Sequence, residues 1–85
     1  MYKVFFKKSA AKELRKLPEF IIKKVYYLVE ALKNNQIIPN TKALTGFKDL
    51  YRTRFGDYRV VYLKDTQIKI ITITKIAHRK DVYKE

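Results

Sequence analysis

The chain has 85 residues, and 20 Lys and Arg against 8 Asp and Glu give a formal net charge of +12. This length predicts a single domain over residues 1–85, and the 47% hydrophobic content predicts a folded chain. The absence of cysteine and the presence of one histidine and two glycines exclude disulfides, clustered zinc ligands and a glycine-rich phosphate loop.

The first 34 residues predict a short strand and two helices. Tyr2 to Phe6 is rich in β-forming residues, which favours a strand. Ser9 is the expected N-cap of a short helix whose apolar positions are Ala10, Leu14 and Leu17. Pro18 is expected to open a second helix as its first residue, and Asn34-Asn35 to end it. The apolar face of that helix is Ile21, Val25, Leu28, Val29 and Leu32.

The second half changes to a period of two, after a connection at residues 35–46. Residues 48–55, 58–64 and 67–76 predict three antiparallel strands, with turns at Gly56-Asp57 and Asp65-Thr66. The order β-α-α-β-β-β predicts an α+β fold. Two N-terminal helices would pack on one face of a small, mainly antiparallel four-stranded sheet.

The first hairpin predicts a cationic sheet face. A two-residue turn at Gly56-Asp57 places Arg54 opposite Arg59 and Arg52 opposite Val61, with Lys48 on the same face. Like charges directly opposite each other destabilise a ladder, and no acid on that face relieves this pair. An external anion is therefore the expected partner, although arginines on an open sheet face can also be merely solvated.

The last strand carries apolar residues on both faces, which predicts a central position between the 58–64 strand and the N-terminal one. The tail that follows would fold over the cationic face and form a cleft. His78 is the only side chain whose ordinary pKa lies near neutrality, and Tyr83 could stack on a base.

The charge and the absent segments limit the possible partners. No apolar run approaches the ~18–20 residues of a membrane span, and no signal peptide is present, so a cytoplasmic protein without a membrane partner is expected. Self-repulsion at +12 costs stability, which indicates a polyanionic partner such as nucleic acid, an acidic protein or an anionic membrane surface, of which the membrane ranks lowest because no helix has an apolar face to spare.

Two segments resemble the RelE branch of the RelE/ParE toxin superfamily. They are Leu44 to Tyr62, LTGFKDLYRTRFGDYRVVY, and His78 to Tyr83, HRKDVY. The resemblance covers essentially the whole chain. It implies a toxin of a type II toxin–antitoxin pair that enters the ribosomal A site and cleaves mRNA there. It also implies a cognate RelB-like antitoxin, expected to be acidic and partly disordered.

The resemblance implies the roles of the site residues. Arg54, Arg59, Arg79 and Tyr83 match the family's catalytic positions, and Lys48, Arg52, His78 and Lys80 are expected to bind RNA. The ribose 2′-OH would attack the adjacent phosphorus and expel the 5′-oxygen, with no metal or other cofactor. Arg54 and Arg59 would bind the non-bridging oxygens, Arg79 would serve the leaving oxygen, and Tyr83 would stack on a base.

One departure from the family pattern leaves the general base open. The second-strand basic pair can be lysines in the family, whereas here it is Arg52 and Arg54, and arginine does not deprotonate usefully. Lys48 and His78 remain as candidates. Two other functions stay open as well: a ParE-like inhibitor of gyrase without nuclease activity, and a non-catalytic basic module that binds RNA or the ribosome.

Overall fold

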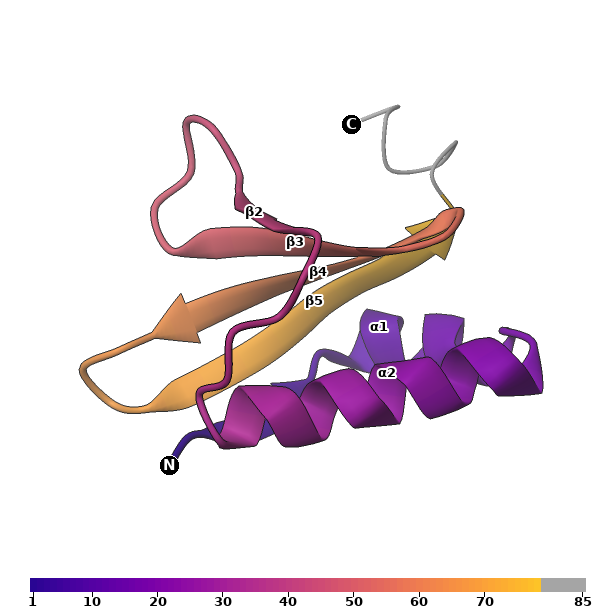
Figure 1. Ribbon diagram of the computed structural model, residues 1–85, viewed down its shortest axis with the longest axis horizontal. Helices are drawn as coiled ribbons and strands as arrows, with labels where there is room; N and C mark the ends of the chain where they lie inside the picture. Colours follow the sequence, from indigo (N-terminus) through magenta and orange to yellow (C-terminus); the bar gives the residue numbers. More distant parts are fainter. Residues whose placement is uncertain (79–85) are drawn as a thin grey trace.

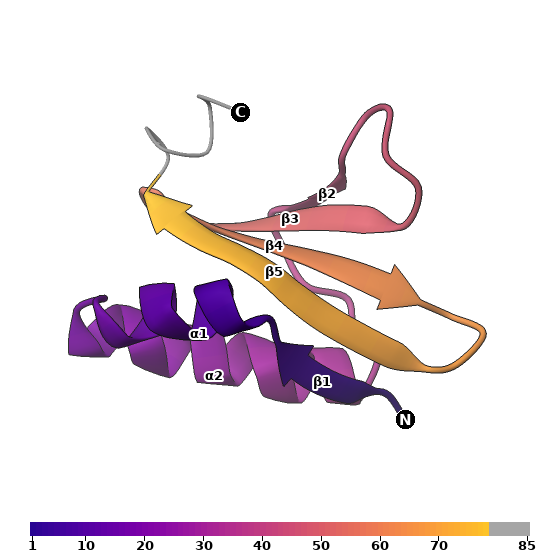
Figure 2. The ribbon, with the colours of Figure 1, turned by 180° about the vertical axis from the view of Figure 1, so that it is seen from behind.

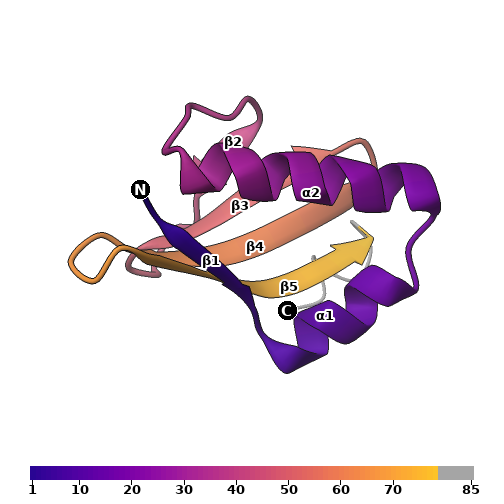
Figure 3. The same ribbon diagram turned by 90° about the horizontal axis from the view of Figure 1, so that it is seen from below.

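Helices α1 (Lys8–Arg15) and α2 (Glu19–Lys33) lie on one face of a twisted sheet in the computed structural model, which describes residues 1–78 (Figures 1 and 3). The sheet of these residues has five strands in the order β1-β5-β4-β3-β2. Their bounds are β1 Lys3–Phe6, β2 Thr41–Ala43, β3 Leu50–Phe55, β4 Tyr58–Asp65 and β5 Ile70–His78. The predicted α+β class is confirmed.

β5 is an interior strand between β1 and β4, the two neighbours predicted from its two apolar faces. It pairs in parallel with β1 and antiparallel with β4 (Figure 2). Ile71 and Ile73 are fully buried among the helices. Parallel strands need a crossover connection. The connection from β1 to β5 comprises α1, α2 and three further strands.

The strand count was predicted too low by one. β2 lies within the connection expected at residues 35–46 and pairs antiparallel with β3, Thr41 opposite Thr53. Three residues are too few to show an alternation of apolar and polar side chains. This strand therefore forms because it pairs with β3 in the folded chain. β5 also begins at Ile70 rather than at residue 67, because Asp65 Oδ1 accepts the Gln67 and Ile68 backbone N–H groups and widens the turn.

The helix starts differ from the prediction by one or two residues. α1 begins at Lys8 with Lys7 as its N-cap, so Ser9 lies inside the helix and the predicted Ser9 cap is wrong. Lys7 already donates its backbone N–H to Ile73 O at 2.8 Å, which fixes where the chain leaves the sheet. Pro18 is the N-cap of α2 rather than its first residue.

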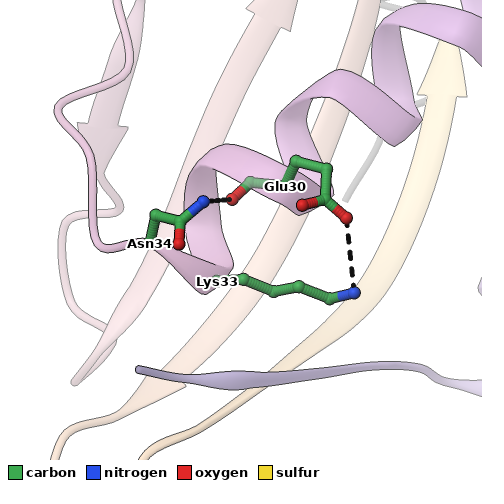
Figure 4. Close-up of polar contacts among 3 residues, drawn as sticks. All are labelled: Glu30, Lys33 and Asn34. Atoms are coloured by element: carbon green, nitrogen blue, oxygen red, sulfur yellow. Dashed lines mark hydrogen bonds and ion pairs between the residues drawn. The ribbon is translucent and has the colours of Figure 1, made fainter.

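The end of α2 is fixed by a left-handed residue. Asn35 has φ 53°, and the backbone N–H of Gln36 reaches Ala31 O at 3.0 Å, which is a Schellman motif. Asn34 Nδ2 donates to Glu30 O at 3.0 Å, and Lys33 Nζ lies 3.4 Å from Glu30 Oε1 (Figure 4). The predicted end of the helix at Asn34-Asn35 is confirmed.

The core lies between the helices and the sheet. Val25 and Leu28 of α2 are fully buried against Val60 of β4 and Ile76 of β5. Burying a side chain of this size contributes about 1.5–3 kcal/mol. At the β2 side of this layer the rings of Tyr51 and Tyr62 stack, with centroids 5.7 Å apart.

A polar cluster sits in the same layer. The hydroxyls of Thr41 and Thr53 lie 2.7 Å apart and share a hydrogen bond that joins β2 to β3. Burial raises the pKa of the Tyr62 phenol above its ordinary 10.0, although hydrogen bonding to Thr53 and Thr41 opposes the shift. No helix in the described part of the chain is long and apolar enough to cross a membrane.

Candidate RNA-binding site

The β3–β4 hairpin brings two arginines together at its turn. The predicted register is confirmed, with Arg54 opposite Arg59, Arg52 opposite Val61 and Phe55 opposite Tyr58. Gly56 opens the turn with φ 56°, a left-handed conformation that glycine adopts without steric cost. The two guanidinium groups therefore leave neighbouring strands on the same face of the sheet.

One carbonyl oxygen holds both guanidinium groups. Arg54 Nε donates to Gly56 O at 3.1 Å, and Arg59 Nη1 donates to the same oxygen at 3.3 Å. Two cations that share an acceptor lie side by side, despite their mutual repulsion. The hairpin thus builds a paired cationic site at its tip.

The two arginines differ in exposure. Arg54 is exposed, whereas Arg59 is only 2% exposed, so Arg59 is not a solvated arginine of an open sheet face. The Arg59 guanidinium is fixed beneath the surface, where a lower dielectric strengthens its field. Arg54 is placed to meet a ligand directly, and Arg59 adds a fixed positive charge behind it.

Carboxylates do not neutralise the more exposed arginines of this face. Among residues 1–78, the only ion pair joins Lys33 and Glu30 on α2. Arg52 and Arg54 therefore have no described carboxylate oxygen within 4.0 Å. This arrangement suits an anionic ligand from outside the chain.

Arg52 lies further along the same face, in a cleft of about 670 Å³. The start of α1, the loop before β3 and strands β3, β4 and β5 form the walls and floor. Its charged lining residues are Lys7, Glu13, Arg52 and Lys75, and its apolar ones are Leu44, Phe47, Leu50 and Val61. The cleft and the arginine pair are thus built on the same sheet face.

The structure places both candidate general bases away from the arginine pair. Lys48 lies in the loop before β3, which starts at Leu50 rather than at the predicted residue 48. His78 pairs with Tyr58 and packs edge-on against its ring, with centroids 5.5 Å apart. Because Tyr58 packs on the core, His78 lies on the helix face of the sheet, opposite Arg54.

Three of the predicted site residues, Arg79, Lys80 and Tyr83, lie outside the described residues. Lys75 was not predicted at all. It lines the cleft because β5 carries a bulge: Val61 pairs with Lys75, but Tyr62 pairs with Ile73, which leaves Thr74 as an extra residue. The three-residue step between buried Ile73 and Ile76 is the sequence signal that could have indicated it.

Known proteins share the sequence pattern and the fold of this chain. The family model described as the ParE toxin of the type II toxin–antitoxin system parDE matches residues 4–83. The chain belongs to this ParE/RelE toxin family.

Relatives within the family are RelE proteins. The chain is 37% identical to the putative toxin RelE1 of Methanocaldococcus jannaschii, over 98% of this chain and 96% of that protein. The RelB–RelE antitoxin–toxin complex from Methanococcus jannaschii matches with a TM-score of 0.80 and 25% identity, over 94% of this chain and 95% of that one.

The archaeal RelE–RelB complex from Pyrococcus horikoshii OT3 gives a TM-score of 0.78 and 32% identity, covering 92% of this chain and 94% of that one. The predicted resemblance is confirmed, and the ParE-like alternative is not favoured. The chain is a RelE-like toxin of the type II toxin–antitoxin class.

Proposed function

We propose that this RelE-like toxin cleaves mRNA on the ribosome. The observation that carries the proposal is the pair of guanidinium groups on Gly56 O, one exposed and one fixed behind it. Fixed donors aimed at developing negative charge are an effective way to stabilise a phosphorane-like transition state. The cleft beside the pair offers room for the RNA chain.

The proposed reaction is attack of a ribose 2′-OH on the adjacent phosphorus. The new O–P bond forms as the bond to the 5′-oxygen breaks, which leaves a 2′,3′-cyclic phosphate and a 5′-hydroxyl. Arg54 and Arg59 bind the non-bridging oxygens, Arg79 stabilises the charge on the leaving oxygen, which takes up a proton from solvent, and Tyr83 stacks on a base to hold the bent backbone in line.

The ribosome would complete this site. Arginine cannot accept the 2′-OH proton at neutral pH. Lys48 lies in a loop beyond the start of β3, and His78 lies on the other sheet face. We therefore propose that ribosomal positioning of the mRNA supplies the in-line geometry and the proton acceptor, which makes the isolated chain a poor nuclease.

An antitoxin is the proposed regulatory partner. The matched structures from Methanococcus jannaschii and Pyrococcus horikoshii contain RelE together with RelB. With a net charge of +12, this chain suits a RelB-like segment that is acidic and partly disordered, and that folds as it covers the cationic face.

In vitro translation with mapping of mRNA 3′ ends tests the proposal. New 3′ ends at ribosomal positions are expected with the full chain, and Arg54→Ala should lower their yield at least tenfold. Arg15→Ala, which removes an exposed arginine of α1 outside the cleft, is the matched control. Uncut mRNA alongside normal translation would contradict the proposal.

Two other readouts separate the alternatives. Translation that stops without new 3′ ends would indicate a non-catalytic module that binds RNA or the ribosome. Loss of supercoiling by gyrase when the chain is added would indicate a ParE-like toxin.

A further inference from the structure

We propose that the cleft beside the arginine pair is a subsite for one further ribonucleotide of the substrate, held by Arg52, Lys75 and Phe47. This inference rests on the proposed function, because it extends the RNA path away from the reacting phosphate. It assigns the phosphate to Arg52 and Lys75, and the base to the Phe47 ring.

The β5 bulge is what delivers Lys75 to the cleft. Side chains of a regular strand alternate between faces, so after buried Ile73 the position of Lys75 would point to the core. The extra residue, Thr74, shifts the phase, and both Thr74 and Lys75 line the cleft while Ile76 returns to the core. The Thr74 hydroxyl donates to Val61 O at 3.3 Å and holds the bulge in place.

Arg52 and Lys75 flank the same residue of the central floor. Val61 pairs with Arg52 on one side and with Lys75 on the other. Neighbouring strands lie about 4.8 Å apart, so the two backbones are ~10 Å apart and both long side chains can reach an anion above Val61. Two cations on opposite sides of one position form a clamp for a phosphate.

The spacing along β3 continues the path from the reacting site. Arg52 and Arg54 are two residues apart on one face, which is ~6.6 Å at about 3.3 Å per residue. This is close to the spacing of neighbouring phosphates in an extended single strand. Arg54 can thus hold one phosphate while Arg52 holds the next.

The cleft also carries an aromatic ring suited to a base. Phe47 is 64% exposed at the rim, although a phenyl ring is usually buried. Aromatic rings interleaved with cations are typical of grooves for single-stranded nucleic acid. The lining holds three cations, Lys7, Arg52 and Lys75, against the one carboxylate of Glu13, so as a whole it favours an anion.

Binding of short uncleavable RNA tests this subsite without any nuclease reaction. The probes are a 2′-O-methylated dinucleotide and hexanucleotide, each carrying a fluorophore, titrated with the full chain by fluorescence anisotropy. Phe47→Ala is expected to weaken hexanucleotide binding about tenfold, which corresponds to ~1.4 kcal/mol of lost stacking. Neither Phe47→Ala nor Lys75→Gln should change dinucleotide binding by more than about twofold.

The salt dependence of RNA binding distinguishes a phosphate contact from a purely structural role of Lys75, because a structural role would not change this dependence. Lys75→Gln should reduce the slope of log K against log salt by about 0.7, the contribution of one phosphate contact on a single strand. Lys12→Gln, at an exposed position of α1 outside the cleft, should leave the slope unchanged. Circular dichroism shows whether each variant keeps its fold.

Each outcome decides the inference. Hexanucleotide binding no tighter than dinucleotide binding, or an unchanged slope in Lys75→Gln, overturns it. Variants that still bind RNA but no longer bind the antitoxin, the protein encoded by the adjoining reading frame, would assign the cleft to the antitoxin instead. Variant-sensitive binding by a chain that cuts no mRNA would support the subsite while contradicting the proposed nuclease activity.

Discussion

Gly56 combines two tasks in one residue. Its carbonyl accepts hydrogen bonds from Arg54 and Arg59, and its φ of 56° closes the turn that sets their register. A side chain at this φ costs about 1–2 kcal/mol, even though an added Cβ would meet no atom within 4 Å. The site therefore depends on the backbone geometry of a residue without a side chain.

Gly56→Ala should reduce both stability and cleavage. We expect the free energy of unfolding in urea to fall by about 1–2 kcal/mol, with fewer new mRNA 3′ ends because the carbonyl shifts under both guanidinium groups. Val29→Ala in the core of α2 is the control for lost stability, because Val29 is buried and lies outside both the cleft and the hairpin. It should lose comparable stability and retain cleavage. Equal cleavage by both variants would remove Gly56 from the site.

Arg79→Ala should abolish toxicity while the fold survives. The expected role of Arg79 is at the leaving oxygen, a contact that exists only during the reaction, so substitution should affect rate and not folding. Growth of cells expressing the variant measures toxicity, and thermal unfolding measures the fold. A variant as toxic as the unchanged chain would exclude Arg79 from the mechanism.

At the scale of elements, α1 is attached to the sheet by one carboxylate. β1 ends at Phe6, so beyond it the edge of β5 has no strand partner among the described residues, and Glu13 Oε1 accepts the Ile76 backbone N–H at 2.9 Å. This hydrogen bond lies directly after the bulge at Thr74. It joins the helix to the strand segment that presents Lys75.

Glu13→Ala should lower the free energy of unfolding by about 1.5–3 kcal/mol, the value of a hydrogen bond to a charged acceptor. Glu13→Gln keeps a carbonyl acceptor and should recover about half of the loss. Urea unfolding of the three chains measures both. An alanine variant as stable as the unchanged chain would mean that water replaces the carboxylate at this edge.

The β2–β3–β4 layer predicts alkaline sensitivity through Tyr62. Its pKa is raised by burial, so between the unfolded value of 10.0 and the higher folded value the unfolded chain binds fewer protons. Stability is fully present below pH 10 and is lost as pH rises through the folded pKa. Urea unfolding at pH 9 and pH 11 measures the effect. The free energy of unfolding should decrease less between these two pH values in Tyr62→Phe than in the unchanged chain. Equal decreases would contradict this assignment.

How much of these elements the sequence could predict depends on whether the signal is local. The register of Arg54 against Arg59 was predictable because a two-residue turn fixes all pairs at once. β2 was not, because its three residues pair only through the fold. The only sequence sign of the bulge is the irregular three-residue step from Ile73 to Ile76. The burial of Arg59 depends on the residues packed around it, which the spacing of residues along the sequence does not predict.

At the scale of the whole molecule, charge dominates. The chain carries a net charge of +12, and within residues 1–78 only Lys33 and Glu30 form an ion pair. Like charges held on so small a domain repel one another, and folding brings them closer together. The folded state therefore bears a cost that an acidic partner or dissolved salt would reduce.

Added salt should stabilise the isolated chain against unfolding. Between 20 and 300 mM KCl the midpoint of urea unfolding is expected to rise, because salt shortens the screening length to below about 10 Å. Changing exposed Lys23 and Lys24 to Glu alters the charge by −4, from +12 to +8, and should make the rise shallower. A midpoint that falls with salt would contradict this explanation.

The order of strands also has a consequence for synthesis. Of the described strands β5 is made last, yet it lies between β1 and β4 and carries the central isoleucines. Until β5 has left the ribosome, β1 has no neighbour in the sheet and α1 has no edge to attach to. A nascent chain therefore cannot bury the isoleucines of β5 or attach α1 to the sheet until nearly all of residues 1–78 have been made.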